Sequence, residues 1–295
     1  MWRLSVVILA GLLTLSAADP PGQAPRIALV LDVSASMGEP TADGVPKIEA
    51  TRQAVKATLR FLAQANPIPR VTVIAFDNDP HALYPLSNNM DAIGQVVDKL
   101  PGRVRGGTNI GAALQEAIRQ FEGQREGFIV LMTDGIPTQG LTAAQIIDGP
   151  AREAHEKGHC FYTLGLGDYD AEFLEQLRRA SPCPYADQVL GADAAPRLVW
   201  AFSAAAHAVT GLQPTTSSGR LEAGETVSAE VTVPGHQAEL RISAVSTGAR
   251  LEIALADPVG REPEPSGHSE GPGLRGLAVP NPTPGRWALT LTNPS

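Results

Sequence analysis

The order of apolar and polar residues divides the chain into two parts with different periodicities. Up to about residue 211, short apolar runs alternate with segments in which apolar residues recur every three or four positions. Strands without a polar face are buried on both sides, as in a parallel sheet covered by helices. The runs that predict such strands are residues 27–31, 71–76, 128–132 and 160–166.

The segments between these runs have helical patterns, each with one apolar face. The face residues are Ile48, Val55, Leu59 and Leu62 in the first segment and Ile110, Leu114, Ala117, Ile118 and Phe121 in the second. Further helices are predicted over 142–158, 170–181 and 194–209, with Gly149 and Pro150 breaking the first of these. This alternation predicts an α/β fold with an open, doubly wound, mostly parallel sheet flanked by helices.

Beyond about residue 212 the period changes to two. The apolar residues that alternate with polar neighbours are Val227, Ala229, Val231 and Val233, then Leu251, Ile253 and Leu255, and finally Trp287, Leu289 and Leu291. This pattern predicts a small all-β sandwich of immunoglobulin-like type over residues 219–295. The turn-forming residues 213–219 are typical of a linker, and the Pro- and Gly-rich residues 261–273 are typical of a mobile loop.

The N-terminal segment has the pattern of a secretory signal peptide. Arg3 precedes an apolar run over residues 4–15, and Ser16 and Ala18 occupy the −3 and −1 positions of a cleavage site. We therefore predict that residues 1–18 are removed and that the mature chain is secreted or periplasmic; the alternative is that the segment is kept as an uncleaved anchor. No later apolar stretch has the roughly 20 residues that a membrane span requires, so no span is predicted in the mature chain.

The composition narrows the classes of partner. Hydrophobic residues make up 43% of the 295 residues and charged residues 18%, which is ordinary for a globular protein. The formal net charge is −8, with 31 acidic and 23 basic residues and no dense basic run. The chain thus lacks the basic surface that neutralises phosphates, and nucleic acid is excluded as a partner.

Cys160 and Cys183 are the two cysteines of the chain. Cys160 lies at the start of one predicted strand, and Cys183 lies just before "YADQVL", which has the pattern of the next parallel strand. Neighbouring strand starts bring Cα atoms within the roughly 4.4–6.8 Å that a disulfide requires, and export supplies an oxidising compartment. We therefore predict a Cys160–Cys183 disulfide.

Three short segments place oxygen groups where a ligand site is expected. "DVSAS" puts Asp32, Ser34 and Ser36 after one predicted strand, and "TDG" puts Asp134 after another. "RGGTN" puts Thr108 near the start of a predicted helix. Each segment alone is a common turn or helix cap. Ligands of open α/β sheets lie at the carboxyl ends of the strands, so we expect the three segments to meet there.

Together the three segments resemble the metal ion-dependent adhesion site of the von Willebrand factor type A family. That pattern is D-x-S-x-S, then a Thr in a middle loop, then an Asp after a later strand, and the resemblance covers roughly residues 25–211. It implies that Ser34, Ser36 and Thr108 bind the cation directly and that Asp32 and Asp134 support it, largely through bound waters.

The resemblance implies a function that the chemistry of the ligands supports. Mg²⁺ prefers about six hard oxygen ligands, so Mg²⁺ is the expected ion, with Mn²⁺ and Ca²⁺ as alternatives. Neutral hydroxyls leave its charge under-compensated, so an Asp or Glu of a partner protein can fill an open position. We expect a protein-binding module for adhesion or assembly. We also expect loss of Asp134 to leave a folded protein, because Asp32 and Asp134 repel each other without the ion.

Two alternatives remain beside this interpretation. "HEKGH", residues 155–159, fits H-E-x-x-H and suggests a zinc metalloprotease using His155, Glu156 and His159. That motif needs a continuous helix, whereas Gly158 favours a helix end there. The second alternative is a structural subunit whose metal only stabilises the fold. The chain has neither a G-x-S-x-G nucleophile motif nor a P-loop, so we predict that it is not an enzyme.

Overall fold

The chain folds as two compact units in the computed structural model. The model describes residues 3–13, 24–63, 65, 67–100, 104–183, 190–209, 213–235, 237, 239–246, 251–265, 267–271 and 274–294. One unit comprises Gln23–Thr210, and the other comprises Gly211–Ser295 together with Met1–Gly22. Each unit has its own sheet arrangement and its own core.

The Gln23–Thr210 unit is built on a six-stranded sheet with the order β4-β3-β2-β5-β6-β7. The strands are β2 (Arg26–Asp32), β3 (Arg70–Phe76), β4 (Pro80–Ser87), β5 (Gly127–Thr133), β6 (Cys160–Leu166) and β7 (Leu190–Ala192). All neighbours are parallel except β3 and β4, which form an antiparallel hairpin. The mostly parallel, doubly wound sheet predicted from the apolar runs is confirmed.

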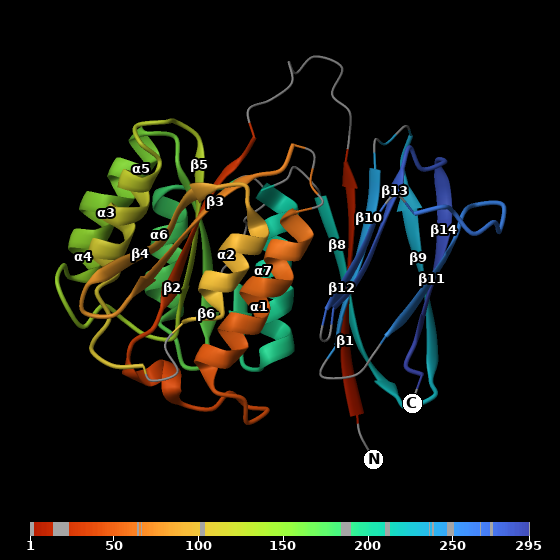
Figure 1. Cartoon of the computed structure of the whole chain (residues 1–295), viewed down its shortest axis with the longest axis horizontal. Helices are drawn as coiled ribbons and strands as arrows, with labels where there is room; N and C mark the ends of the chain where they lie inside the picture. The colour runs from red at the N-terminus through yellow and green to blue at the C-terminus, as the bar shows by residue number, and fades with distance from the viewer. Residues whose placement is uncertain are drawn as a thin grey trace. The chain divides into compact units, whose positions relative to one another are not determined.

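Helices cover both faces of this sheet (Figure 1). They are α1 (Lys47–Leu62), α2 (Met90–Val97), α3 (Ile110–Gln120), α4 (Ala143–Ile146), α5 (Arg152–Glu156), α6 (Ala171–Ala180) and α7 (Ala195–Val209). Helices α1, α2 and α7 lie on one face, and α3 to α6 lie on the other. The apolar faces predicted for α1 and α3 are buried, as expected. Pro150 lies in a π-helical turn, Ile147–Ala151, that joins α4 to α5, because proline cannot donate the regular backbone hydrogen bond.

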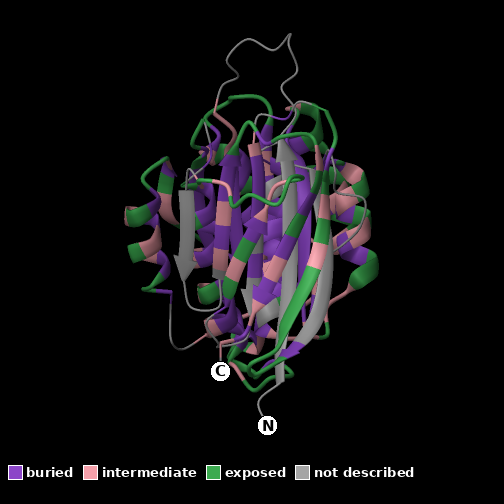
Figure 2. Cartoon of the chain, turned by 90° about the vertical axis from the view of Figure 1, so that its right-hand side faces the viewer, coloured by how far each residue is buried: buried purple, intermediate pink, exposed green. Residues whose placement is uncertain are grey.

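The other unit contains two antiparallel sheets, with strand orders β12-β13-β10-β1-β8 and β11-β14-β9. The strands are β1 (Arg3–Leu13), β8 (Gln213–Glu222), β9 (Thr226–Val233), β10 (Glu239–Ser246), β11 (Glu252–Ala256), β12 (Gly267–Gly271), β13 (Leu274–Pro280) and β14 (Gly285–Thr292). Exposed and buried positions alternate along β14, where Trp287, Leu289 and Leu291 enter the core. Figure 2 shows this alternation along the strands that face the viewer. The all-β part predicted from the period-two pattern is present.

Two local predictions for this unit are wrong. Residues 213–219 are part of β8 rather than a linker, because β8 pairs along its length with β1. Residues 267–271, expected within a mobile loop, form β12 and pair with β13. Pairing partners distant in sequence supply the backbone hydrogen bonds in both cases, and local composition does not reveal such partners.

Strand β1 lies within the segment that the sequence predicts to be a signal peptide. It is antiparallel to β8 on one side and to β10 on the other, with Val6 opposite Gly219 and Ser246. Removal of residues 1–18 therefore takes out a strand that both neighbours use for hydrogen bonding.

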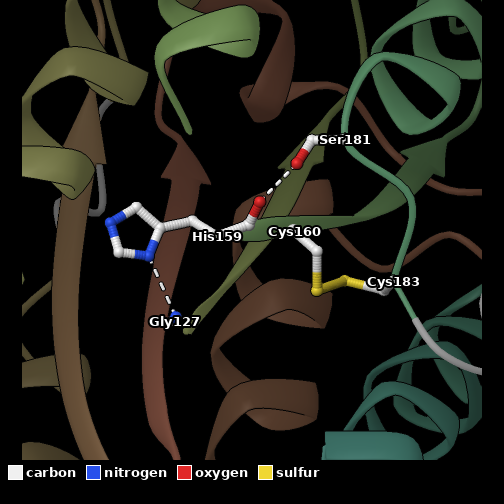
Figure 3. The surroundings of a disulfide bond; sticks show 5 residues. All are labelled: Gly127, His159, Cys160, Ser181 and Cys183. Atoms are coloured by element: carbon white, nitrogen blue, oxygen red, sulfur yellow. Dashed lines mark hydrogen bonds between the residues drawn. A yellow bond between two sulfur atoms is a disulfide. The ribbon is translucent and has the colours of Figure 1, made fainter. Parts of the chain in front are cut away.

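The predicted disulfide between Cys160 and Cys183 is confirmed, with a Cα–Cα distance of 4.9 Å (Figure 3). Cys160 begins β6, and the Phe161 amide donates to the Ser181 carbonyl at 3.0 Å, which brings the segment before Cys183 alongside β6. Most of the strand predicted from "YADQVL" lies outside the described residues, and Leu190 begins β7.

Removing the disulfide is expected to destabilise the protein without disturbing the carboxyl ends of the strands. The double variant Cys160→Ala with Cys183→Ala should lower the free energy of unfolding by about 3 kcal/mol, because the unfolded chain loses the closure of a loop with a sequence separation of 23. Denaturant unfolding of both proteins measures the difference. Free thiols titrating stoichiometrically in the native protein would contradict the bridge.

Candidate metal centre

The candidate site begins at Asp32, the last residue of the central strand β2. Its side chain is fully buried, and both carboxylate oxygens are used. Oδ1 accepts from the Ser34 amide at 2.8 Å, and Oδ2 accepts from the Thr133 hydroxyl at 2.6 Å. Thr133 ends β5, the strand beside β2. The pairing of β2 with β5 therefore fixes the carboxylate at the edge where the strand order changes direction.

Burial raises the pKa of Asp32 to about 6, although hydrogen bonds from Ser34 and Thr133 partly offset the effect. The negative charge of Asp134 raises this pKa further. The ionised form of Asp32 is thus under-stabilised by the protein alone, and a nearby cation would stabilise it.

Hydrogen bonds connect the two serines that follow Asp32 with each other and with Asp134. The Ser34 and Ser36 hydroxyl oxygens lie 3.2 Å apart, and the Ser36 hydroxyl donates to Asp134 Oδ1 at 2.8 Å. Ser34 is buried, whereas Ser36, in the 3₁₀ turn Ala35–Gly38, is partly exposed. The structure therefore brings four of the five predicted site residues together at one strand-end cluster.

Thr108, the fifth residue, lies in a loop that backbone hydrogen bonds attach to the cluster. The Ala35 amide donates to the Gly106 carbonyl at 3.3 Å, and Gly106 has φ +80°, a conformation that glycine adopts readily. The Thr108 amide donates to the Thr138 hydroxyl at 2.8 Å. The N-cap of α3 is Asn109, whose side chain accepts from the Ala112 amide, so Thr108 is not needed as the helix cap.

Lys47 is a site residue that the sequence patterns missed. It is the first residue of α1, and its ammonium Nζ donates to Asp134 Oδ2 at 2.7 Å and to Glu39 Oε2 at 3.0 Å. The Lys47 side chain is 9% exposed and that of Asp134 is fully buried, whereas that of Glu39 is 66% exposed. Burial alone lowers the pKa of Lys47, but the hydrogen bonds to Asp134 and Glu39 outweigh it and raise this pKa above its usual value.

The ligands at this edge fit a hard divalent cation. They are hydroxyl and carboxylate oxygens from two strand ends, with an adjoining loop that carries a further hydroxyl. Within the described ranges, no group of three or more His, Cys, Asp or Glu side chains is placed to hold a metal ion. A cation at this edge would therefore depend on the serine and threonine hydroxyls as well as on the carboxylates.

The H-E-x-x-H residues do not form the arrangement that a zinc protease requires. Helix α5 ends at Glu156, and Gly158 has φ +74°, so His159 lies off the helix just before β6. His159 is buried, its Nδ1 accepts from the Gly127 amide at 2.9 Å, and its carbonyl accepts from the Ser181 hydroxyl (Figure 3). The continuous helix on which the protease alternative depends is absent from residues 152–159, all of which the structure describes.

Comparisons with known proteins identify the domain. Residues 27–136 match the family model of the von Willebrand factor type A domain, a range that includes all five predicted site residues. The mouse (Mus musculus) protein "Inter alpha-trypsin inhibitor, heavy chain 4" is 26% identical over 172 residues, which is 53% of this chain. This match spans only 17% of that relative's length. Residues 27–136 of this chain therefore have the sequence of a von Willebrand factor type A domain.

Solved structures agree on the fold. A von Willebrand factor type A structure from Catenulispora acidiphila has a TM-score of 0.51 at 17% identity, covering 98% of this chain and 61% of that one. Proximal thread matrix protein 1 from the mussel byssus has a TM-score of 0.51 at 16% identity, covering 74% of this chain and 50% of that one. In that structure zinc occupies the metal ion-dependent adhesion site motif.

Among the described residues, no helix is both long enough and apolar enough to cross a membrane.

His159 predicts a specific dependence of stability on pH. Burial, with smaller contributions from nearby cations, lowers its pKa from 6.5 to about 4. Between these values the unfolded chain binds a proton that the folded chain does not, so stability is lost as the pH falls from about 6.5 to 4. The loss from this group is at most roughly 3 kcal/mol.

The variant His159→Asn keeps an acceptor for the Gly127 amide but has no group that titrates between pH 4 and 6.5 at this position. Its stability should therefore fall less steeply than that of the wild type as the pH is lowered through this range. Thermal unfolding of both proteins in chelator at several pH values measures it as the difference between the two curves. Asp32 acts in the opposite direction, because its raised pKa favours proton binding in the folded state, but it is common to both proteins and cancels. Parallel curves would show that His159 does not carry the effect.

Proposed function

We propose that this chain is an exported, divalent-cation-dependent protein-binding module that serves in adhesion or assembly. The observation that carries the proposal is the hydrogen bond between Ser36 and Asp134. It joins the segment that follows β2 to the segment that follows β5, and the two residues are 98 positions apart in the sequence. Oxygen ligands from segments so distant in sequence meet at the edge of the sheet where α/β folds bind ligands. The type A domain and its zinc-occupied structural relative support a metal at this edge.

In this proposal Ser34, Ser36 and Thr108 bind the cation directly, and Asp32 and Asp134 support it from the next shell of ligands. Mg²⁺ is the expected ion, with Mn²⁺ and Ca²⁺ as alternatives. The cation keeps a position open for an Asp or Glu of a partner protein. The chain's own groups orient the ligands and exclude competing waters from the buried side of Asp32.

The proposal includes no catalytic step. The Ser36 hydroxyl donates to the Asp134 carboxylate, but that carboxylate is also neutralised by Lys47, which makes it a weak base. His159 is committed to the Gly127 amide. The remaining alternative, a metal that only stabilises the fold, differs from ours in what a chelator does to the folded state.

Cation binding should depend on the hydroxyl groups. The variants Ser34→Ala and Thr108→Val should each weaken Mn²⁺ binding at least about tenfold, because the loss of a direct ligand costs no less than the loss of an outer-shell partner. Isothermal titration with Mn²⁺ measures the affinities. Ser228→Ala, at an exposed position of β9, is the matched control and should bind as the wild type does. Equal affinity in all four proteins would refute these ligands.

Partner binding should depend on the cation while the fold does not. Circular dichroism spectra with Mg²⁺ and with chelator should superimpose, because the apolar core cluster of the unit packs without any residue of the site. Capture of native extracellular or periplasmic proteins should be lost with chelator and with Ser34→Ala, and should return with Mg²⁺. Unfolding in chelator would favour the stabilising metal instead.

Export should remove the N-terminal segment. The intact mass of the exported protein should correspond to a chain beginning at Asp19, because Ser16 and Ala18 form the cleavage pattern. Mass spectrometry of the secreted or periplasmic fraction measures it. An exported protein that keeps residues 3–13 would instead retain β1 between β8 and β10.

A further inference from the structure

Lys47 occupies a position that electrostatics disfavours for a lysine. It is the first residue of α1, where the helix dipole repels positive charge, and its side chain is almost completely buried. The N-cap residue, Pro46, provides no side-chain hydrogen bond to this helix end. A buried cation at this place requires a specific counter-ion, and the structure supplies one in Asp134.

The contacts of Lys47 fix its ammonium group beside the metal site. The two carboxylate oxygens of Asp134 have different donors: Oδ1 accepts from the Ser36 hydroxyl, and Oδ2 accepts from the Lys47 ammonium. Gly167 leaves room for the lysine, since a Cβ built there would lie only 3.2 Å from Lys47 Cε. The second partner, Glu39, is mostly exposed and contributes a solvent-screened charge.

We propose that Lys47 is a specificity-determining residue that reduces the affinity of the site for the cation and increases the affinity of the loaded site for a carboxylate. This inference rests on the function proposed above. With Asp32 and Asp134 ionised, a divalent cation alone would leave the buried groups neutral. The ammonium of Lys47 adds one positive charge, so the buried groups of the loaded site keep a net charge of about +1 with which to attract an anionic ligand. The charge of Glu39 offsets this only in part, because its side chain is 66% exposed and screened by solvent.

The same charge has a role when no cation is bound. Asp32 and Asp134 then repel each other, and Lys47 neutralises Asp134 at 2.7 Å. Loss of Asp134 would relieve its repulsion with Asp32, but it would also remove the counter-ion of Lys47. The variant Asp134→Ala would leave the Lys47 ammonium buried with only the exposed Glu39 as partner, which destabilises the protein.

The variant Lys47→Met separates this proposal from a merely structural role, because it should change two affinities in opposite directions. Mn²⁺ affinity should rise about tenfold on loss of the neighbouring positive charge. Affinity of the Mn²⁺-loaded protein for acetate, followed through the relaxation of water protons, should fall. Damage to the site would weaken both, and Lys47→Arg, which keeps the charge, should behave more like the wild type.

A matched control lies on the same helix. Lys56 forms an ion pair with Asp98, with 2.6 Å between Nζ and Oδ1, and neither residue belongs to the site. Its side chain is 33% exposed, and Lys56→Met removes the same charge from α1. It should leave both affinities unchanged. If Lys56→Met reproduces the effects of Lys47→Met, general electrostatics rather than the site residue is responsible and the proposal fails.

A second pair of variants keeps the test decisive if Lys47→Met folds poorly without metal. Lys47→Met combined with Asp134→Asn removes both charges of the Lys47–Asp134 pair, so neither partner is left buried and unpaired, and it should bind Mn²⁺ more tightly than Asp134→Asn alone. Unchanged or weaker binding overturns the role of Lys47. Failure of the proposed function has a different signature, in which Mn²⁺ binds wild type and Ser34→Ala equally.

Discussion

The parallel pairing of β2 with β3 on one side and β5 on the other is the constraint on which the rest of the type A domain depends. Its register places Leu31 opposite Met132, so that Asp32 and Thr133 end their strands together and the Thr133 hydroxyl reaches the Asp32 carboxylate. A slip of one residue would turn Asp32 toward the opposite face of the sheet. The buried apolar runs of both strands resist such a slip, and core packing thereby sets the geometry of the site.

Much of the type A domain was predictable because its signals are local. Continuous apolar runs gave four of its strands, and the buried faces of α1 and α3 followed from helical periodicity. Strands β8 and β12 were not predictable in this way, because their hydrogen-bonding partners are remote and their own composition is typical of turns. In the site, the hydroxyl and carboxylate residues form a recognisable pattern. Lys47 lies outside this pattern, and Thr133, although it begins "TDG", has no predicted role; their distances to Asp134 and Asp32 reveal both.

The H-E-x-x-H residues show how the fold decides what a motif can do. In a zinc protease the two histidines lie one turn apart on a helix, but the left-handed conformation of Gly158 ends the helix between them. His159 then enters the core, where its ring lies 4.5 Å from that of Phe121 and its Nδ1 meets the Gly127 amide. A neutral histidine suits this place, because burial lowers its pKa to about 4. His159 thus serves core packing, whereas His155 and Glu156 stay exposed on the helix before it.

Different kinds of groups lie at the two edges of the sheet where the parallel strands begin and end. At the amino end of β6, the Cys160–Cys183 disulfide links two segments covalently, and the buried His159 accepts a hydrogen bond from the Gly127 amide. At the carboxyl ends of β2 and β5 the sheet presents two buried carboxylates, of which Lys47 neutralises one. A mostly parallel sheet permits this division, because its parallel strands end at the same edge and charge can gather there without interrupting the core. The disulfide and the buried histidine are therefore separate from the carboxylates of the candidate site, and a change at one end need not propagate to the other.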